Sequence, residues 1–173
     1  MQEPGITGVT LIILNLIFFC AGQHESFFHK YKLKSGYPKT LSFLIAPFLH
    51  GNYIHLIFNL LNLFFFSSLF ELQIGQLKFC VLYCISLIVS NYFFLYFNRK
   101  SLSNSLVGAS GAISGLTFAA IILHPWFWFY GGIYLLSTVY GMKDFNEYSA
   151  RNIAHEAHLG GAVAGIIFSV CFL

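Results

Sequence analysis

Polar side chains that could cooperate in nucleophilic catalysis lie inside the long apolar runs of this sequence. Ser110 lies in an apolar run that continues to Leu123, and His158 lies near the start of the last such run. A serine hydroxyl becomes a nucleophile at neutral pH only when a base lies within hydrogen-bond reach. Histidine is the most frequent such base. The pair therefore predicts acyl-transfer chemistry, with Ser110 as the nucleophile and His158 as the general base.

The same chemistry needs hydrogen-bond donors, because attack on an amide builds a negative charge on its oxygen. We expect these donors to be the backbone N–H of Ser110, the amide of Asn59 and the imidazole of His55. His55 and Asn59 are four residues apart and so share one helix face. Glu156 is two residues from His158 and would lie on another face, so the sequence favours a Ser–His dyad over a triad.

Composition shows what must position these groups. The 173 residues are 57% hydrophobic and only 9% charged, whereas soluble domains carry about 25% charged residues. A water-soluble core cannot absorb so much apolar surface, so the sequence predicts a multi-pass membrane protein of one domain, residues 1–173. The net charge of +3 is modest and gives no indication of a nucleic-acid partner.

An all-α bundle of six membrane spans is expected. The short apolar run 41–48 is too short to cross and is interpreted as re-entrant or interfacial, after a lysine-rich loop, 23–40. The expected spans are 6–21, 52–69, 77–97, 105–123, 126–140 and 152–173.

The second, fourth and sixth spans run in the same direction, and their polar residues lie toward their starts. At a rise of 1.5 Å per residue, Ser110 and His158 would lie roughly 8 to 10 Å below one membrane surface. Polar groups inside a bilayer are costly unless they find partners or line a wet cavity, so a shared depth predicts an internal site. The alternative is that each group only links helices, at about 0.6 kcal/mol per hydrogen bond.

Glycines at a spacing of four predict close contact between the fourth and sixth spans. The contact would place Gly111 and Gly115 of one span against Gly161 and Gly165 of the other, and we expect Gly108 to serve helix packing as well.

The sequence implies no metal ion and no cofactor. His155-Glu156-x-His158 lacks the His-Glu-x-x-His spacing that puts two ligands on one helix face. The cysteines show neither metal-ligand nor disulfide spacing, and we expect buried thiols without a chemical role. They are Cys20, Cys80, Cys84 and Cys171.

Three short stretches, around Ser110, His55 and His158, resemble the motifs of the rhomboid family of intramembrane serine proteases. Residues 108–111, Gly-Ala-Ser-Gly, resemble the family's Gly-x-Ser-Gly, whose serine is the nucleophile. Residues 50–59 are similar to its His-x4-His-x3-Asn, and residues 157–165 to its Ala-His-x-x-Gly-x3-Gly, whose histidine is the base. Residues 71–75 match the Glu-x3-Gly turn that follows the second span.

The resemblance implies a six-helix rhomboid bundle and a serine endopeptidase that cleaves transmembrane segments of other membrane proteins within the lipid bilayer. It assigns catalysis to Ser110 and His158, and support of the oxyanion to His55 and Asn59. The sequence departs from the family's pattern in three places. The family's Trp-Arg pair is absent near residues 41–42, its tyrosine four places after the nucleophile is Ser114, and its Gly-Gly pair is replaced at residues 67–68.

Two other functions remain open. A non-catalytic rhomboid-like protein would bind membrane clients, and a small transporter or channel could be built on the same polar layer. For location, the resemblance implies a multi-pass protein of a bacterial inner (plasma) membrane with the site opening outward. Eight of the nine Lys and Arg residues lie in the first, third and fifth loops, which by the positive-inside rule favours the opposite orientation. We follow the resemblance.

Overall fold

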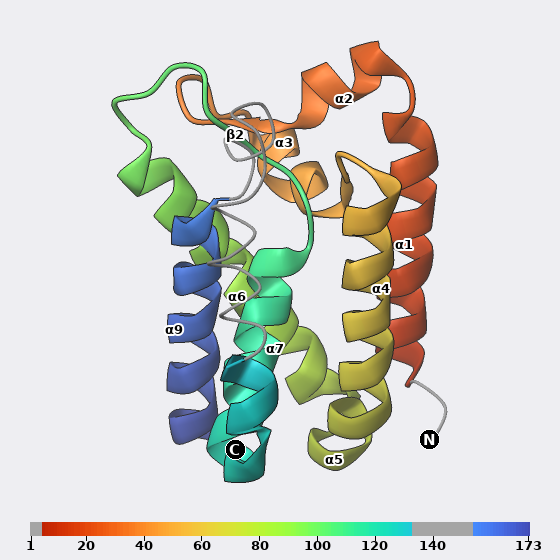
Figure 1. Cartoon of the computed structure of the whole chain (residues 1–173), viewed down its shortest axis with the longest axis vertical. Coiled ribbons are helices and arrows are strands. Elements are labelled where there is room, and N and C mark those ends of the chain that lie inside the picture. Colours follow the sequence, from red (N-terminus) through yellow and green to blue (C-terminus); the bar gives the residue numbers. More distant parts are fainter. Residues whose placement is uncertain (1–4, 133–153) are drawn as a thin grey trace.

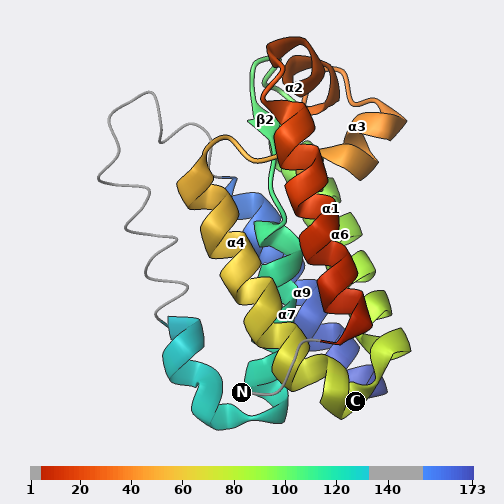
Figure 2. The same cartoon turned by 90° about the vertical axis from the view of Figure 1, so that its right-hand side faces the viewer.

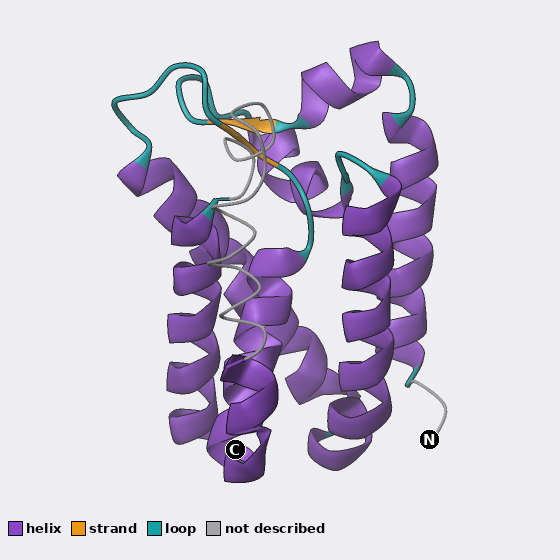
Figure 3. Ribbon diagram, in the orientation of Figure 1, coloured by secondary structure: helices purple, strands orange, loops and turns teal. Residues whose placement is uncertain are grey.

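The computed structural model describes residues 5–132 and 154–173, and these are mostly helical (Figures 1 and 3). Most of the expected span 126–140, the loop after it and the first residues of the last span lie outside the described residues. The elements are α1 (Ile6–Gly22), α2 (Glu25–Tyr31), β1 (Leu33–Lys34), α3 (Thr40–Ile45), the 3-10 turn η1 (Ala46–Phe48), α4 (Tyr53–Phe66), the π-helical turn η2 (Ser67–Glu71), α5 (Leu72–Ile74), α6 (Gln76–Phe97), β2 (Ser105–Leu106), α7 (Ser110–Leu123), the 3-10 turn η3 (Pro125–Phe127) and α9 (His155–Phe172).

Several described helices are long and apolar enough to cross a membrane. Within the described residues these are the continuous helix Tyr53–Ile74, α6 and α9, and α1 with α2 forms a pair bent by 119° that would make a fourth. The apolar helix α7 is shorter, at 14 residues. The prediction of a helical, multi-pass membrane protein is confirmed, and the count of six spans stays a prediction.

Helix α7 occupies the centre of the bundle. It packs mainly against α6 and α9, and α4 and α1 lie on its other side (Figure 1). Its apolar side chains Ile113 and Leu116 are fully buried, in one core with Leu63 and Phe66 of α4 and Phe79 of α6. Helices α4, α7 and α9 all run in the same direction, and α7 begins farther inside the bundle than α4 does (Figure 1).

Small residues allow these central helices to approach closely. A Cβ atom on Gly161 of α9 would lie 1.8 Å from the carbonyl oxygen of Gly111, and one on Gly165 would lie 2.1 Å from that of Gly115. On the other side of α7, Cβ atoms on these two glycines would lie 1.8 and 2.0 Å from the Oγ atoms of α6 serines. Those serines are Ser90, which faces Gly111, and Ser86, which faces Gly115.

The segment before Ser110 forms a strand and a turn rather than the first turns of a span. Ser105 and Leu106 pair with Lys34 and Leu33 in a two-stranded antiparallel ladder. Helix α7 begins only at Ser110. The expected span 105–123 is therefore wrong at its start. The depth estimate for Ser110, which counted helical rise from residue 105, does not apply.

The loop 23–40 is also more ordered than the sequence suggested. Helix α2, strand β1 and helix α3 lie together at the end of the bundle where α1 ends and α4 begins (Figure 2). Asn91 of α6 donates a hydrogen bond to the carbonyl oxygen of Phe43 in α3, at 2.8 Å. The run 41–48 does not cross the bundle, because it forms the short helices α3 and η1.

All four cysteines are exposed on the outer faces of their helices. The expectation of buried thiols is therefore wrong. The sequence could not make this distinction, because in a membrane protein the lipid-facing surface is as apolar as the core.

Candidate active site

Ser110 is the first residue of α7, and a glycine two places earlier sets the turn into the helix. Gly108 has φ +105°, a conformation that L side chains rarely adopt. Its backbone N–H donates to the carbonyl oxygen of Ala46, at 3.0 Å, which fixes the turn against η1. The first N–H groups of a helix have no partner within it. The start of α7 therefore presents backbone donors beside a partly exposed serine.

His158 lies one turn into α9, and its ring reaches Ser110. The Nε2 atom of His158 and the Oγ atom of Ser110 are 2.8 Å apart, a hydrogen-bond distance. The close glycine contacts between α7 and α9 bring the two residues together. The Oγ of Ser114 adds a further link, since it donates to the carbonyl oxygen of His158 at 2.9 Å.

His55 lies in the first turn of α4, and its ring faces the turn at Gly108 that leads into α7. Asn52 caps this helix, because its Oδ1 accepts from the backbone N–H of His55 at 2.7 Å. A Cβ atom on Gly108 would lie 2.5 Å from Cε1 and 2.7 Å from Nε2 of the His55 ring. The His55 ring therefore lies directly against Gly108, two places before Ser110.

Asn59 follows His55 by one helical turn and is buried. Its Nδ2 donates to the backbone carbonyl oxygen of His55 at 2.9 Å. A side-chain amide carries two N–H donors, so this bond uses one of them. The bond also ties the amide to the helix turn that carries the His55 ring.

His50 supports the site from the loop before α4. Its ring is buried, its Nδ1 is 3.2 Å from the carbonyl oxygen of Phe48, and its centroid is 4.9 Å from that of His55. Burial lowers the pKa of His50, and the nearby His55 lowers it further, against a smaller opposing effect of the bond to Phe48. A neutral ring that donates through Nδ1 fits this position.

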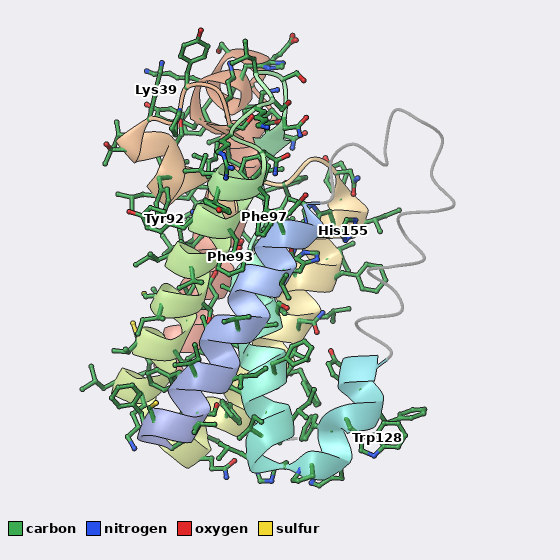
Figure 4. The ribbon with its side chains drawn as sticks, turned by 90° about the vertical axis from the view of Figure 1, so that its left-hand side faces the viewer. Lys39, Tyr92, Phe93, Phe97, Trp128 and His155 are labelled. Atoms are coloured by element: carbon green, nitrogen blue, oxygen red, sulfur yellow. The ribbon has the colours of Figure 1, made fainter. Side chains whose placement is uncertain are left out.

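The remaining polar residues at the start of α9 do not form a metal site in the part of the chain that the structure describes. His155 lies at the start of α9 (Figure 4), with its ring centroid 6.3 Å from that of His158. The described residues contain no group of three or more His, Cys, Asp or Glu side chains placed to hold a metal ion.

Three residues whose packing roles the sequence did not predict hold the helices together. Ser86 and Ser90 of α6 face the two glycines of α7, and their spacing of four matches that of the glycines. Glu71 was assigned only to a turn, yet it accepts hydrogen bonds from the backbone N–H groups of Thr7 and Gly8, at 2.8 and 2.9 Å. No spacing rule links residues so distant in the sequence.

The chain also matches a known protein family. The family model of the Rhomboid domain matches residues 38–173, which is most of the chain. The chain belongs to the rhomboid family. The matched region of this rhomboid includes His55, Asn59, Ser110 and His158.

The relatives of this rhomboid include proteins named as proteases and proteins named only as rhomboid-like. Rhomboid-like protein 11, chloroplastic, of Arabidopsis thaliana is 30% identical over 91% of this chain and 62% of its own length. Rhomboid protease AarA of Providencia stuartii is 29% identical over 75% of this chain and 54% of its own length. Putative rhomboid protease YdcA of Bacillus subtilis (strain 168) is 38% identical over 42% of this chain and 36% of its own length. The chain thus spans less than two thirds of these relatives.

Proposed function

We propose that this rhomboid is an intramembrane serine endopeptidase in which Ser110 attacks a peptide bond and His158 acts as general base. The observation that carries the proposal is the distance of 2.8 Å between the Ser110 Oγ and the His158 Nε2. Residues 48 positions apart in the sequence meet there, from two helices whose glycine contacts leave little freedom to separate. A pair linked in this way meets the geometric requirement for an activated nucleophile.

The reaction would proceed in two halves. His158 accepts the hydroxyl proton as the Ser110 Oγ bonds to the scissile carbonyl carbon, and it then donates that proton to the leaving amine. The same ring then deprotonates a water molecule, which attacks the acyl ester. His158 donates this proton to the Ser110 Oγ as the new carboxyl end is released. Because Ser110 and His158 are both only partly buried, substrate and water can reach them.

The oxyanion would be stabilised by donors on both sides of the serine. The backbone N–H groups at the start of α7 lie on one side. The His55 ring, packed against Gly108, lies on the other. The remaining N–H of Asn59 would act together with this ring. Preorganised donors of this kind typically contribute about 10² to 10³ in rate.

The substrate would be a transmembrane helix of another membrane protein, unwound near one membrane surface. The candidate site lies where α4, α7 and α9 begin, and α7 begins farther inside the bundle than α4 does (Figure 1). The membrane we propose is a bacterial plasma membrane, and two of the relatives above come from bacteria.

Co-expression with tagged single-span membrane proteins tests this proposal. We expect cleavage by the unchanged chain, and none above background by Ser110→Ala or His158→Ala at equal accumulation. Ser169→Ala is the matched control, because Ser169 is a buried serine of α9 that donates only within its own helix, to the Gly165 carbonyl oxygen. Cleavage retained in Ser110→Ala would refute the serine mechanism.

The alternative is a non-catalytic rhomboid-like protein that binds membrane clients, and the mixed naming of the relatives keeps this alternative open. It predicts that tagged clients co-purify with the unchanged chain and with Ser110→Ala equally, without cleavage in either.

A further inference from the structure

The lysine-rich segment between α1 and α3 forms a cavity of about 550 Å³. Its cationic lining comes from α2, from β1 and from the residues just before α3. Among the described residues, no Asp or Glu lines it. Glu25 lies nearby, but it contacts His29 at 3.5 Å on the exposed side of α2. We call this cavity the lysine pocket, and its lining includes His29, Lys30, Lys32, Lys34, Tyr37 and Lys39.

The lysine pocket concentrates positive charge without a matching acid in its lining. Partial burial lowers the pKa of Lys32, and the neighbouring Lys34 lowers it further. Both causes oppose the charged form of Lys32, whereas a bound anion would stabilise that form. A ligand that carries negative charge and several acceptor oxygens fits this lining, as a phosphate group does.

An apolar groove of about 290 Å³ adjoins the lysine pocket, and Lys39 lines both. The groove runs between α3 and α6, and Phe43, Leu44, Tyr92 and Leu95 supply its apolar lining. The rings of Phe43 and Tyr92 pack edge to face, with centroids 5.3 Å apart. Figure 4 shows Lys39 and Tyr92 on the same side of the molecule, with Lys39 nearer the end of the bundle.

The surroundings of the two cavities suit a membrane surface. Tyr37, Leu41 and Leu44 expose between 55 and 72% of their surface beside the lysines. Helix α3 is too short to cross a membrane and lies at one end of the bundle (Figure 2). A short helix with exposed apolar residues and adjacent lysines is typical of the headgroup region.

We propose that the lysine pocket binds the phosphate of an anionic phospholipid and that the adjoining groove takes one of its acyl chains. The sharing of Lys39 places the charged and apolar cavities in the order in which a phospholipid presents its headgroup and its chain. Free inorganic phosphate has the charge but lacks the chain. The groove is therefore the observation that selects the lipid.

The test uses the full chain purified in a mild neutral detergent and incubated with phosphatidylglycerol or phosphatidylcholine. Native mass spectrometry then counts the lipids retained. We expect phosphatidylglycerol to be retained at least about tenfold more than phosphatidylcholine. The triple variant Lys32→Gln, Lys34→Gln, Lys39→Gln should lose that preference. Lys100→Gln, an exposed lysine outside the pocket, should keep it.

Two further arms separate charge from folding and lipid from phosphate. The triple Lys-to-Arg variant at positions 32, 34 and 39 should retain phosphatidylglycerol, because it keeps the positive charge, and thermal unfolding of the glutamine variant should show that this variant is still folded. Glycerophosphoglycerol, the same headgroup without chains, and inorganic phosphate should each compete at least about tenfold more weakly than the lipid. Equal competition by inorganic phosphate would overturn the lipid assignment. Equal retention of both lipids, or of phosphatidylglycerol by the glutamine variant, would overturn the site.

Discussion

At the scale of single residues, the placement of Ser110 depends on a turn that carries out no chemistry itself. Ser110 is placed by a left-handed turn at Gly108, whose N–H binds the Ala46 carbonyl oxygen. The His55 ring fills the space where a Cβ on that glycine would be. Only glycine fits at position 108, whereas Ala109, directly before Ser110, is not restricted in this way.

Substitution of Gly108 tests this arrangement. Gly108→Ala should lower cleavage at least tenfold, because the new Cβ forces an unfavourable φ and displaces the His55 ring. The backbone strain should cost about 1 to 3 kcal/mol of stability. Gly51→Ala is the matched control, since a Cβ there meets open space. Cleavage assays and thermal unfolding of the two variants measure both effects, and equal cleavage would contradict the role given to the turn.

The four residues proposed for the site could be proposed from the sequence because their types and their order along the chain carry the information. Ser110, His158, His55 and Asn59 each lie near the start of an apolar run. Their placement was not predictable from depth, since residues 105–106 form a strand and α7 begins at Ser110. A strand of two residues gives no periodic signal, so the sequence could not reveal it.

At the scale of helices, α7 is held between two neighbours by residues without bulk. Ser86 and Ser90 of α6 lie on one side and Gly161 and Gly165 of α9 on the other. The sequence predicted the α7–α9 contact from glycine spacing. It missed the serines because a serine in an apolar helix is equally consistent with a lipid-facing or an interhelical position.

A bulkier residue at this contact should separate α7 and α9. Gly161→Ala would place its Cβ 1.8 Å from a backbone oxygen of α7, which cannot rotate away. We expect a loss of about 1 to 3 kcal/mol in stability and a loss of cleavage greater than that of Leu159→Ala, an exposed residue of the same helix. Unchanged melting and cleavage in Gly161→Ala would show that α7 and α9 are not held by this contact.

The end of the helix Tyr53–Ile74 carries a second interhelical link. Glu71 is buried, and its carboxylate accepts from two N–H groups in the first turn of α1, whose positive dipole end it faces. Glu71→Ala should destabilise the protein by about 1.5 to 3 kcal/mol per charged hydrogen bond lost. Thermal unfolding in detergent measures the loss. Glu25→Gln, at an exposed site, should melt as the unchanged chain does, and a similar melting temperature for Glu71→Ala would contradict the link.

At the scale of the whole molecule, composition predicted a membrane bundle but not which surfaces face lipid. The exposed cysteines and the exposed apolar residues of α6 and α9 show why, since lipid and core select the same side chains. The lysines of the loop 23–40 raise a related difficulty. The positive-inside rule counts them as a sign of orientation. A role in binding anionic lipid gives them a reason to be present on either side of the membrane.

The central claim is that the Ser110 hydroxyl is a nucleophile activated by His158. The most direct measurement is the intact mass of the purified protein after exposure to a fluorophosphonate probe. We expect one covalent adduct, located on Ser110 by peptide mapping, absent from Ser110→Ala, strongly reduced in His158→Ala and retained in Ser169→Ala. An adduct that persists in Ser110→Ala, or labelling of His158→Ala at the unchanged rate, would contradict it.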